Sequence, residues 1–288
     1  MSIKKELKTL ATRAGGSFKT VHDRQHVAGR LADQLKKLNI QIKAVSHLKS
    51  KHIESYISAR KDDGIGLRTL QNEMAGIRGI LREAGRDTLA DSERISNKFL
   101  EIHGASRNGT HRAMPDERYQ ALLNDLEVKD KGVWVCAQLE RHLGLRAEEA
   151  VQANKSLHKW AKQLESNQPL RVIYGTKGGR NRDVRPVDTE VAKKAVYEAL
   201  KRMKETDGKI IDKDNLKSAM NRHNSIMQSV GCKGVYSPHS LRYAFACDRV
   251  DCYEATGFSK ADALAMTSQD LGHGDGRGTY VKQVYLRK

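Results

Sequence analysis

The sequence predicts a mainly α protein with a small antiparallel β-sheet (α+β), divided into a helical N-terminal domain and a larger C-terminal domain. Apolar residues recur at helical spacing over most of the 288 residues. One stretch, near residues 170–187, carries two β-prone runs on either side of a glycine-rich turn. At roughly 150 residues per domain, the length favours two domains.

The first domain is expected over residues 1–102 as a small bundle of helices. A short apolar pattern at Ile95, Phe99 and Leu100 predicts its last helix. The clearest amphipathic helix earlier in the domain carries an apolar stripe of Leu67, Leu70, Met74, Ile77 and Leu81.

Residues 103–114 differ in composition from the segments on both sides. They are rich in Gly, Ser, Asn and Arg and poor in large apolar side chains. Pro115 follows, a residue suited to the first turn of a helix. This composition indicates a basic linker, and the second domain is expected over residues 115–288.

The second domain is expected to be mostly helical around one hairpin. The run Leu170–Thr176 has strand character, residues 177–181 are turn-like, and Asp183–Val187 can form the returning strand. Helical patterns follow at residues 189–204, 211–229 and 240–252.

The charge of the chain is strongly one-sided. Lys and Arg number 52 against 35 Asp and Glu, which gives a formal net charge of +17 and a pI near 9.7. Basic surface favours a nucleic-acid partner, because each phosphate that a Lys or Arg neutralises releases condensed counterions.

Other composition signals are weaker. The four cysteines form no CxxC pair, which is typical of reduced thiols in a cytosolic protein. The N-terminus lacks the apolar core of a signal peptide, and no run is long enough to predict a membrane span. His22 and His26 lie at i and i+4 but lack partners at zinc spacing, so we interpret them as a solvated helix face.

Several short motifs in the second half could carry chemistry. Each has an ordinary explanation alone: a surface arginine, a charged turn residue, a helix cap, a helix terminator, a packing tyrosine. Their order along the chain is more specific. They are Arg146 in GLRAEE, Lys177 at the hairpin turn, His239 and Arg242 in PHSLR, His273 in LGHG, and Tyr280 and Tyr285 in YVKQVYLRK.

This ordered set resembles the catalytic domain of the tyrosine recombinases, the phage-integrase family. The resemblance covers about residues 113–288. The helical region before it fits the family's core-binding, SAM-like DNA-binding domain by position, although it has no sharp motif. One departure is Tyr243, which stands where the family often has His.

The resemblance implies a role for each motif residue. Arg146, Arg242 and His273 would bind the scissile phosphate, where fixed donors stabilise the charge that develops in the transition state. Tyr285 would attack phosphorus and form a 3′-phosphotyrosyl link. His239 would manage the phenol proton and Lys177 would protonate the leaving 5′-oxygen. Glu149 would support an arginine or the hairpin.

The nucleophile is the least defined of these assignments. Tyr280 lies seven residues after His273 (280−273) and Tyr285 lies twelve after it (285−273), and common family spacing falls between the two. The segment ending VKQVYL resembles the family's Val-x-x-x-Tyr-Leu ending, which favours Tyr285. Tyr280 would then be a packing or phosphate-contacting residue.

The implied protein is a metal- and ATP-independent recombinase without a cofactor. Its partners would be double-stranded DNA at attachment sites, further copies that form a tetramer on DNA, and accessory bending or directionality factors. It would be cytoplasmic, nucleoid-associated when bound to DNA, and would integrate or excise a mobile element. Alternatives are type IB topoisomerase-like relaxation, a catalytically inactive DNA-binding protein and, without support from aromatic stacking motifs, an RNA-binding module.

Overall fold

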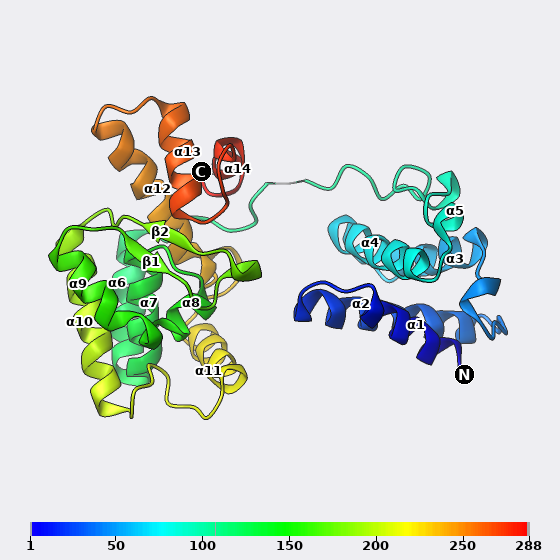
Figure 1. Cartoon of the computed structure of the whole chain (residues 1–288), viewed down its shortest axis with the longest axis horizontal. Helices are drawn as coiled ribbons and strands as arrows, with labels where there is room; N and C mark the ends of the chain where they lie inside the picture. The colour runs from blue at the N-terminus through cyan, green and yellow to red at the C-terminus, as the bar shows by residue number, and fades with distance from the viewer. Residues whose placement is uncertain (1, 107, 287–288) are drawn as a thin grey trace. The chain divides into compact units, whose positions relative to one another are not determined.

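The computed structural model describes residues 2–106 and 108–286 (Figure 1). It divides into two compact units, Met1–Ser106 and Arg107–Lys288. The boundary lies inside the stretch that the sequence indicates as a linker. Within the described residues, none of the helices has the length and apolar character needed to span a membrane.

Within residues 2–106, the regular elements of the first unit are all helical. Helices α1 and α2 pack on each other and on α4, and the amphipathic stripe predicted for α4 is buried through Leu70, Met74, Ile77 and Leu81. The elements are α1 (Ile3–Arg13), α2 (Phe18–Lys37), η1 (Val45–His47), α3 (Ser50–Asp62), α4 (Leu67–Glu83), α5 (Asp87–Ala90) and η2 (Glu93–Ile95).

The helix predicted at Ile95, Phe99 and Leu100 is wrong. The chain forms only the single 3-10 turn η2 there. Ile95 and Leu100 are buried, but Phe99 is 53% exposed, so the apolar residues do not share one buried face. The buried positions come from an irregular segment that covers the bundle.

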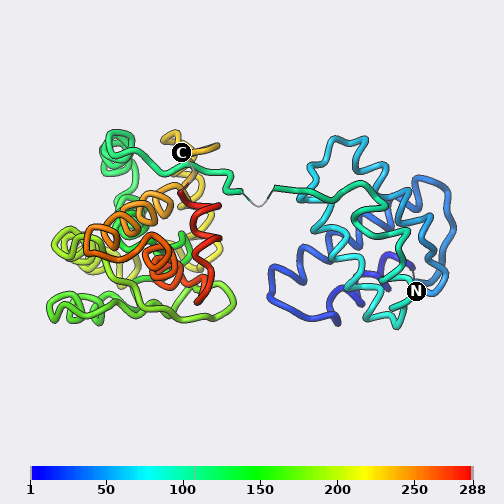
Figure 2. Tube along the Cα trace, turned by 90° about the horizontal axis from the view of Figure 1, so that it is seen from above, coloured from blue at the N-terminus to red at the C-terminus, as the bar shows by residue number. Residues whose placement is uncertain are grey.

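The second unit is helical around one small hairpin. Helix α12 is the central element: it packs on α7 and α13 and buries most of its length. Figure 2 shows α14, in red, beside α13. The helices are α6 (Asp116–Lys129), α7 (Lys131–His142), α8 (Ala147–Val151), η3 (Ala153–Lys155), α9 (Leu157–Glu165), η4 (Lys177–Gly179), α10 (Thr189–Glu205), α11 (Leu216–Ser229), η5 (Gly234–Tyr236), α12 (His239–Ala255), α13 (Lys260–Asp270) and α14 (Gly278–Val284).

The predicted hairpin is present, with shorter strands than expected. Strands β1 (Leu170–Val172) and β2 (Arg182–Val184) pair antiparallel, with Leu170 opposite Val184 and Val172 opposite Arg182. The mainly α fold with a small antiparallel sheet is therefore confirmed. The hairpin packs on α9 and α13, which brings β2 next to the segments that carry the candidate site.

Candidate active site

Arg146 lies at the start of α8, directly after a tight turn. Gly144 has a φ of +58°, and a Cβ there would lie 2.3 Å from the Phe245 ring, so the turn requires glycine. The backbone N–H of Arg146 donates to Glu149 Oε2 at 2.8 Å, and its Nη1 donates to Glu149 Oε1 at 2.7 Å. Glu149 therefore fixes both the backbone and the side chain of Arg146.

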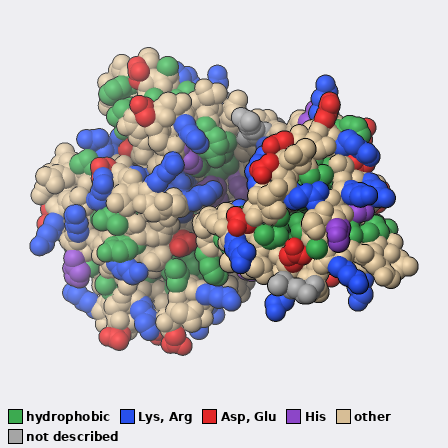
Figure 3. Space-filling view, turned by 45° about the vertical axis from the view of Figure 1, so that its right-hand side comes forward, with side chains coloured by type: hydrophobic (Ala, Val, Ile, Leu, Met, Phe, Trp, Pro, Cys, Tyr) green, Lys and Arg blue, Asp and Glu red, His purple; other side chains and the backbone are tan. Residues whose placement is uncertain are grey.

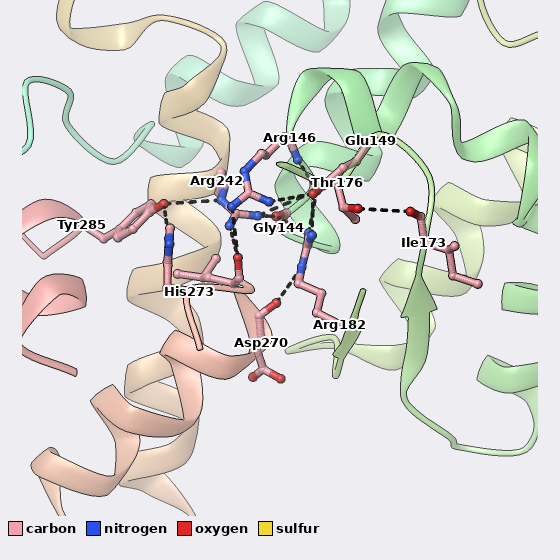
Figure 4. A network of polar contacts seen from close by, with 11 residues as sticks. Gly144, Arg146, Glu149, Ile173, Thr176, Arg182, Arg242, Asp270, His273 and Tyr285 are labelled. Carbon is pink, nitrogen blue, oxygen red and sulfur yellow. Dashed lines mark hydrogen bonds and ion pairs between the residues drawn. The ribbon is translucent and has the colours of Figure 1, made fainter. Parts of the chain in front are cut away.

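Arg242 enters the site from the first turns of α12 and is fully buried (Figure 4). Its Nη1 and Nη2 donate to the carbonyl oxygens of Gly144 and Leu271. Its Nε lies 3.5 Å from the Tyr285 hydroxyl. A guanidinium held by backbone carbonyls from two separate loops has a fixed position, which suits it to stabilise charge at one point.

Glu149 is a buried carboxylate surrounded by three arginines. Arg182 pairs with both of its oxygens, at 2.5 and 2.6 Å, and Arg242 Nη1 lies 4.0 Å away. Burial alone would raise the pKa of Glu149, but the ion pairs with Arg182, Arg242 and Arg146 outweigh burial and lower the pKa to about 2. The carboxylate is therefore charged and compensates the positive charge of the cluster.

Arg182 was not identified by the sequence analysis, although it donates four hydrogen bonds within the cluster. Besides Glu149, it donates through Nε to the Asp270 carbonyl at 2.9 Å and through Nη2 to the Gly144 carbonyl at 3.4 Å. Burial lowers its pKa to about 10. One signal was available: Arg182 and Val184 are two residues apart on a strand and therefore share its buried face.

Tyr285 follows the last turn of α14 and is only 2% exposed. Its hydroxyl lies 2.8 Å from His273 Nε2, and its ring packs on that of Tyr243 with centroids 4.6 Å apart. Burial and the nearby Arg242 and Arg146 lower the pKa of His273 to about 3, so the imidazole is neutral near pH 7. A neutral Nε2 can accept the phenol proton.

Tyr280 lies on α14 but is placed differently. Its side chain is 38% exposed and its ring contacts that of His273 edge-on, with centroids 4.8 Å apart. Within residues 2–106 and 108–286 its hydroxyl has no hydrogen-bond partner. The geometry therefore brings the hydroxyl of Tyr285, rather than that of Tyr280, to Arg242 and His273.

His239 is half-buried at the first residue of α12. Its ring lies 5.5 Å from that of Tyr243 and 6.1 Å from that of Tyr285, between centroids. Burial, with Arg242 and His111 nearby, lowers its pKa to about 3. Two neutral imidazoles thus border the Tyr285 ring, and of these His273 makes the hydrogen bond.

Lys177 stands apart from the other predicted residues. It is exposed at the hairpin tip and has no hydrogen bond or ion pair to the part of the chain that the structure describes. The base of the hairpin is closely packed: Gly175 has a φ of +72°, and a Cβ there would lie 2.6 Å from the Glu148 carbonyl oxygen. The tip therefore projects from a base fixed against α8.

Comparisons with known proteins give the family of the chain. The family model described as "Integrase" matches residues 101–248, more than half of the chain, and the model described as "Phage integrase, N-terminal" matches residues 1–90. The chain belongs to the phage integrase family, the tyrosine recombinases. A search of curated protein sequences gave no match.

Solved integrase structures share the fold. The Tn1549 transposon integrase in complex with a circular intermediate DNA matches with a TM-score of 0.64 at 13% identity, over 99% of this chain and 95% of that one. A lambda integrase dimer bound to a COC′ core site matches at 0.62 and 15%, over 100% and 98%. A lambda integrase tetramer bound to a Holliday junction matches at 0.60 and 17%, over 99% and 77%.

Proposed function

We propose that this protein is a site-specific recombinase that cuts and rejoins DNA through a covalent bond between Tyr285 and a 3′-phosphate. The observation that carries the proposal is the position of the Tyr285 hydroxyl, 2.8 Å from His273 and 3.5 Å from Arg242, beside the buried arginine cluster. The family membership gives the same reaction class.

The arginines would bind the scissile phosphate. Arg146 keeps a side-chain exposure of 22%, so part of this side chain remains accessible to a ligand. Arg242 has five N–H groups, and its contacts to Gly144, Leu271 and Tyr285 engage one N–H on each nitrogen. The remaining N–H groups can point at the non-bridging oxygens, where a fixed donor contributes about 3–4 kcal/mol.

The chemical step is balanced by proton transfers within the site. The Tyr285 oxygen forms a bond to phosphorus while the bond from phosphorus to the 5′-oxygen breaks. The phenol proton passes to a neutral imidazole, and the hydrogen bond favours His273, whereas the family resemblance assigned this role to His239. The 5′-oxygen receives a proton from Lys177. The new phosphodiester conserves the energy needed for rejoining, so neither a metal ion nor ATP enters the scheme.

A suicide-substrate assay tests the proposal. Nicked duplexes that carry candidate attachment sequences would be incubated with the protein in EDTA and without ATP, then separated on denaturing gels. We expect a covalent protein–DNA band whose yield does not change when metal or ATP is added. Detectable DNA binding with no band in any buffer would instead support an inactive DNA-binding protein. Relaxation of plasmids without a specific site would support a type IB topoisomerase.

Lys177 gives a sharper chemical test. Replacing Lys177 with alanine should slow adduct formation by roughly 10²–10⁴-fold, because the leaving alkoxide then lacks its acid. A substrate with sulfur in place of the bridging 5′-oxygen should restore the rate, because a thiolate leaves without a proton. Arg180→Ala, at an exposed position on the same turn, is the matched control. A Lys177→Ala protein that is equally slow on both substrates would contradict the assignment.

The proposed partners follow from charge and from the family. Figure 3 shows Lys and Arg side chains spread over the visible face of both units, which suits a nucleic-acid partner. We propose that the first unit is the core-binding domain, that both units bind double-stranded attachment sites, and that four copies assemble on two such sites. Bending or directionality factors and association with the nucleoid belong to the same proposal.

A further inference from the structure

The segment from Gly109 to Met114, which we call the strap, joins two parts of the second unit that are distant in sequence. It falls in the stretch that composition indicated as a linker, yet it is bonded to the segments that carry His239 and Tyr285. Its backbone hydrogen bonds run from Gly109 N to the Gln283 carbonyl at 3.3 Å, from Arg112 N to the Val235 carbonyl at 2.9 Å, and from Met114 N to the Ser240 carbonyl at 3.1 Å.

Gly109 is fitted closely against the end of α14. A Cβ at this position would lie 2.1 Å from the carbonyl oxygen of Val284, the residue directly before Tyr285. It would also lie 2.7 Å from the Tyr243 hydroxyl. Because the nearer atom belongs to the backbone, any side chain here would displace the strap or the end of α14.

The side chain of His111, in the strap, packs against aromatic rings of the site. Its Nδ1 lies 3.2 Å from the Gly234 carbonyl oxygen and 3.2 Å from Ser237 Oγ. A carbonyl only accepts, so a hydrogen bond to Gly234 places the proton on Nδ1. The His111 ring stands edge-on to His239 and Tyr243, with centroids 6.1 and 5.8 Å apart.

These contacts form a continuous path to the nucleophile. The Tyr243 ring, against which His111 packs, lies 4.6 Å from the ring of Tyr285. His239 lies against both tyrosine rings. The ionisable groups that act on His239 are Arg242, Arg146, Glu149 and His111. The strap thus contacts the site at two points, through Gly109 and through His111.

We propose that Gly109 and His111 are positioning residues for strand cleavage: the strap fixes the His239 ring and the end of α14, and so aligns Tyr285 with the phosphate. The inference rests on the proposed function, since it concerns the rate of the same reaction. Neither residue would bond to the DNA.

The test compares single-turnover adduct formation at saturating protein with DNA affinity and thermal unfolding. His111→Ala should lower the cleavage rate roughly 10–100-fold, the scale of a displaced reacting group, while the Kd for DNA is unchanged. His111→Asn should restore most of the rate, because its amide N–H can replace Nδ1 as the donor to Gly234. Thr110→Ala, at an exposed strap position, is the matched control and should behave as wild type.

Gly109→Ala tests the other contact and should slow cleavage through the displaced end of α14. The inference is overturned if His111→Ala cleaves at the wild-type rate, if it loses affinity and rate in parallel, or if Asn is no better than Ala. If Gly109→Ala does not fold, the His111 variants still decide. A wild-type protein that binds DNA but never forms an adduct would mean that the proposed function itself fails, a result distinct from all of these.

Discussion

Replacing Tyr285 with phenylalanine is expected to abolish covalent attachment to DNA and leave the fold intact. The ring of Tyr285 packs on Tyr243, and phenylalanine keeps that contact. The hydroxyl makes one close hydrogen bond, to His273, whose loss costs about 1 kcal/mol of stability. The substitution removes the proposed nucleophilic oxygen, so adduct formation should fall by at least about 10³-fold.

Tyr280→Phe is the matched control for this prediction. It removes the same atom from a nearby tyrosine in α14, one whose hydroxyl has no hydrogen bond to Arg242 or His273. We expect it to retain adduct formation. Denaturing gels of suicide substrates, with circular dichroism to check the fold, make the comparison. An adduct retained by Tyr285→Phe and lost by Tyr280→Phe would reverse the assignment.

Glu149→Gln should destabilise the second unit strongly. Neutralising this carboxylate leaves Arg146, Arg182 and Arg242 without their shared counterion in a buried site. Removing one partner of a buried ion pair costs about 3–5 kcal/mol. Urea unfolding followed by tryptophan fluorescence measures the loss, because Trp134 and Trp160 both belong to the second unit.

The pH dependence of this effect has a definite sign. The pKa of Glu149 is lowered from 4.5 to about 2, so its stabilising contribution is complete above pH 4.5 and is lost as the pH falls toward 2. The difference in unfolding free energy between wild type and Glu149→Gln should therefore narrow over that window. Glu148→Gln removes the same charge from the exposed neighbouring residue and should change little. Equal losses in the two variants would refute the role of Glu149.

Much of the fold could be predicted because the spacing of apolar residues along the sequence indicates which face of a helix or strand is buried. The stripe through Leu70, Met74 and Ile77 is a helix face in contact with a core, and the hairpin was marked by its glycine-rich turn. The helix predicted around Phe99 is absent because an irregular segment can bury apolar side chains at intervals that resemble helical spacing.

The site was predictable where a motif fixes local geometry, and less so where long-range contacts decide. Arg146 and Glu149 lie three residues apart, a spacing that allows an ion pair within one helical turn, and the structure has this pair. Arg182 interacts with Asp270 across 88 residues, and nothing in its neighbourhood reveals that partner. His111 lies in a segment whose polar composition suggested a linker, while its contacts are with residues more than a hundred positions away.

The exposed tip of the hairpin carries Lys177. Folding fixes the other candidate groups, and we expect bound DNA to position this lysine. The proposed nucleophile, Tyr285, and the arginines are held by hydrogen bonds within the protein, whereas Lys177 has no hydrogen bond or ion pair among residues 2–106 and 108–286. A duplex that binds out of register would then contact the arginine cluster without placing Lys177, the proposed proton donor, at the leaving oxygen. The protein would then discriminate among target sequences by its cleavage rate more than by its DNA affinity. Lys177→Ala should therefore remove the difference in cleavage rate between matched and mismatched sites.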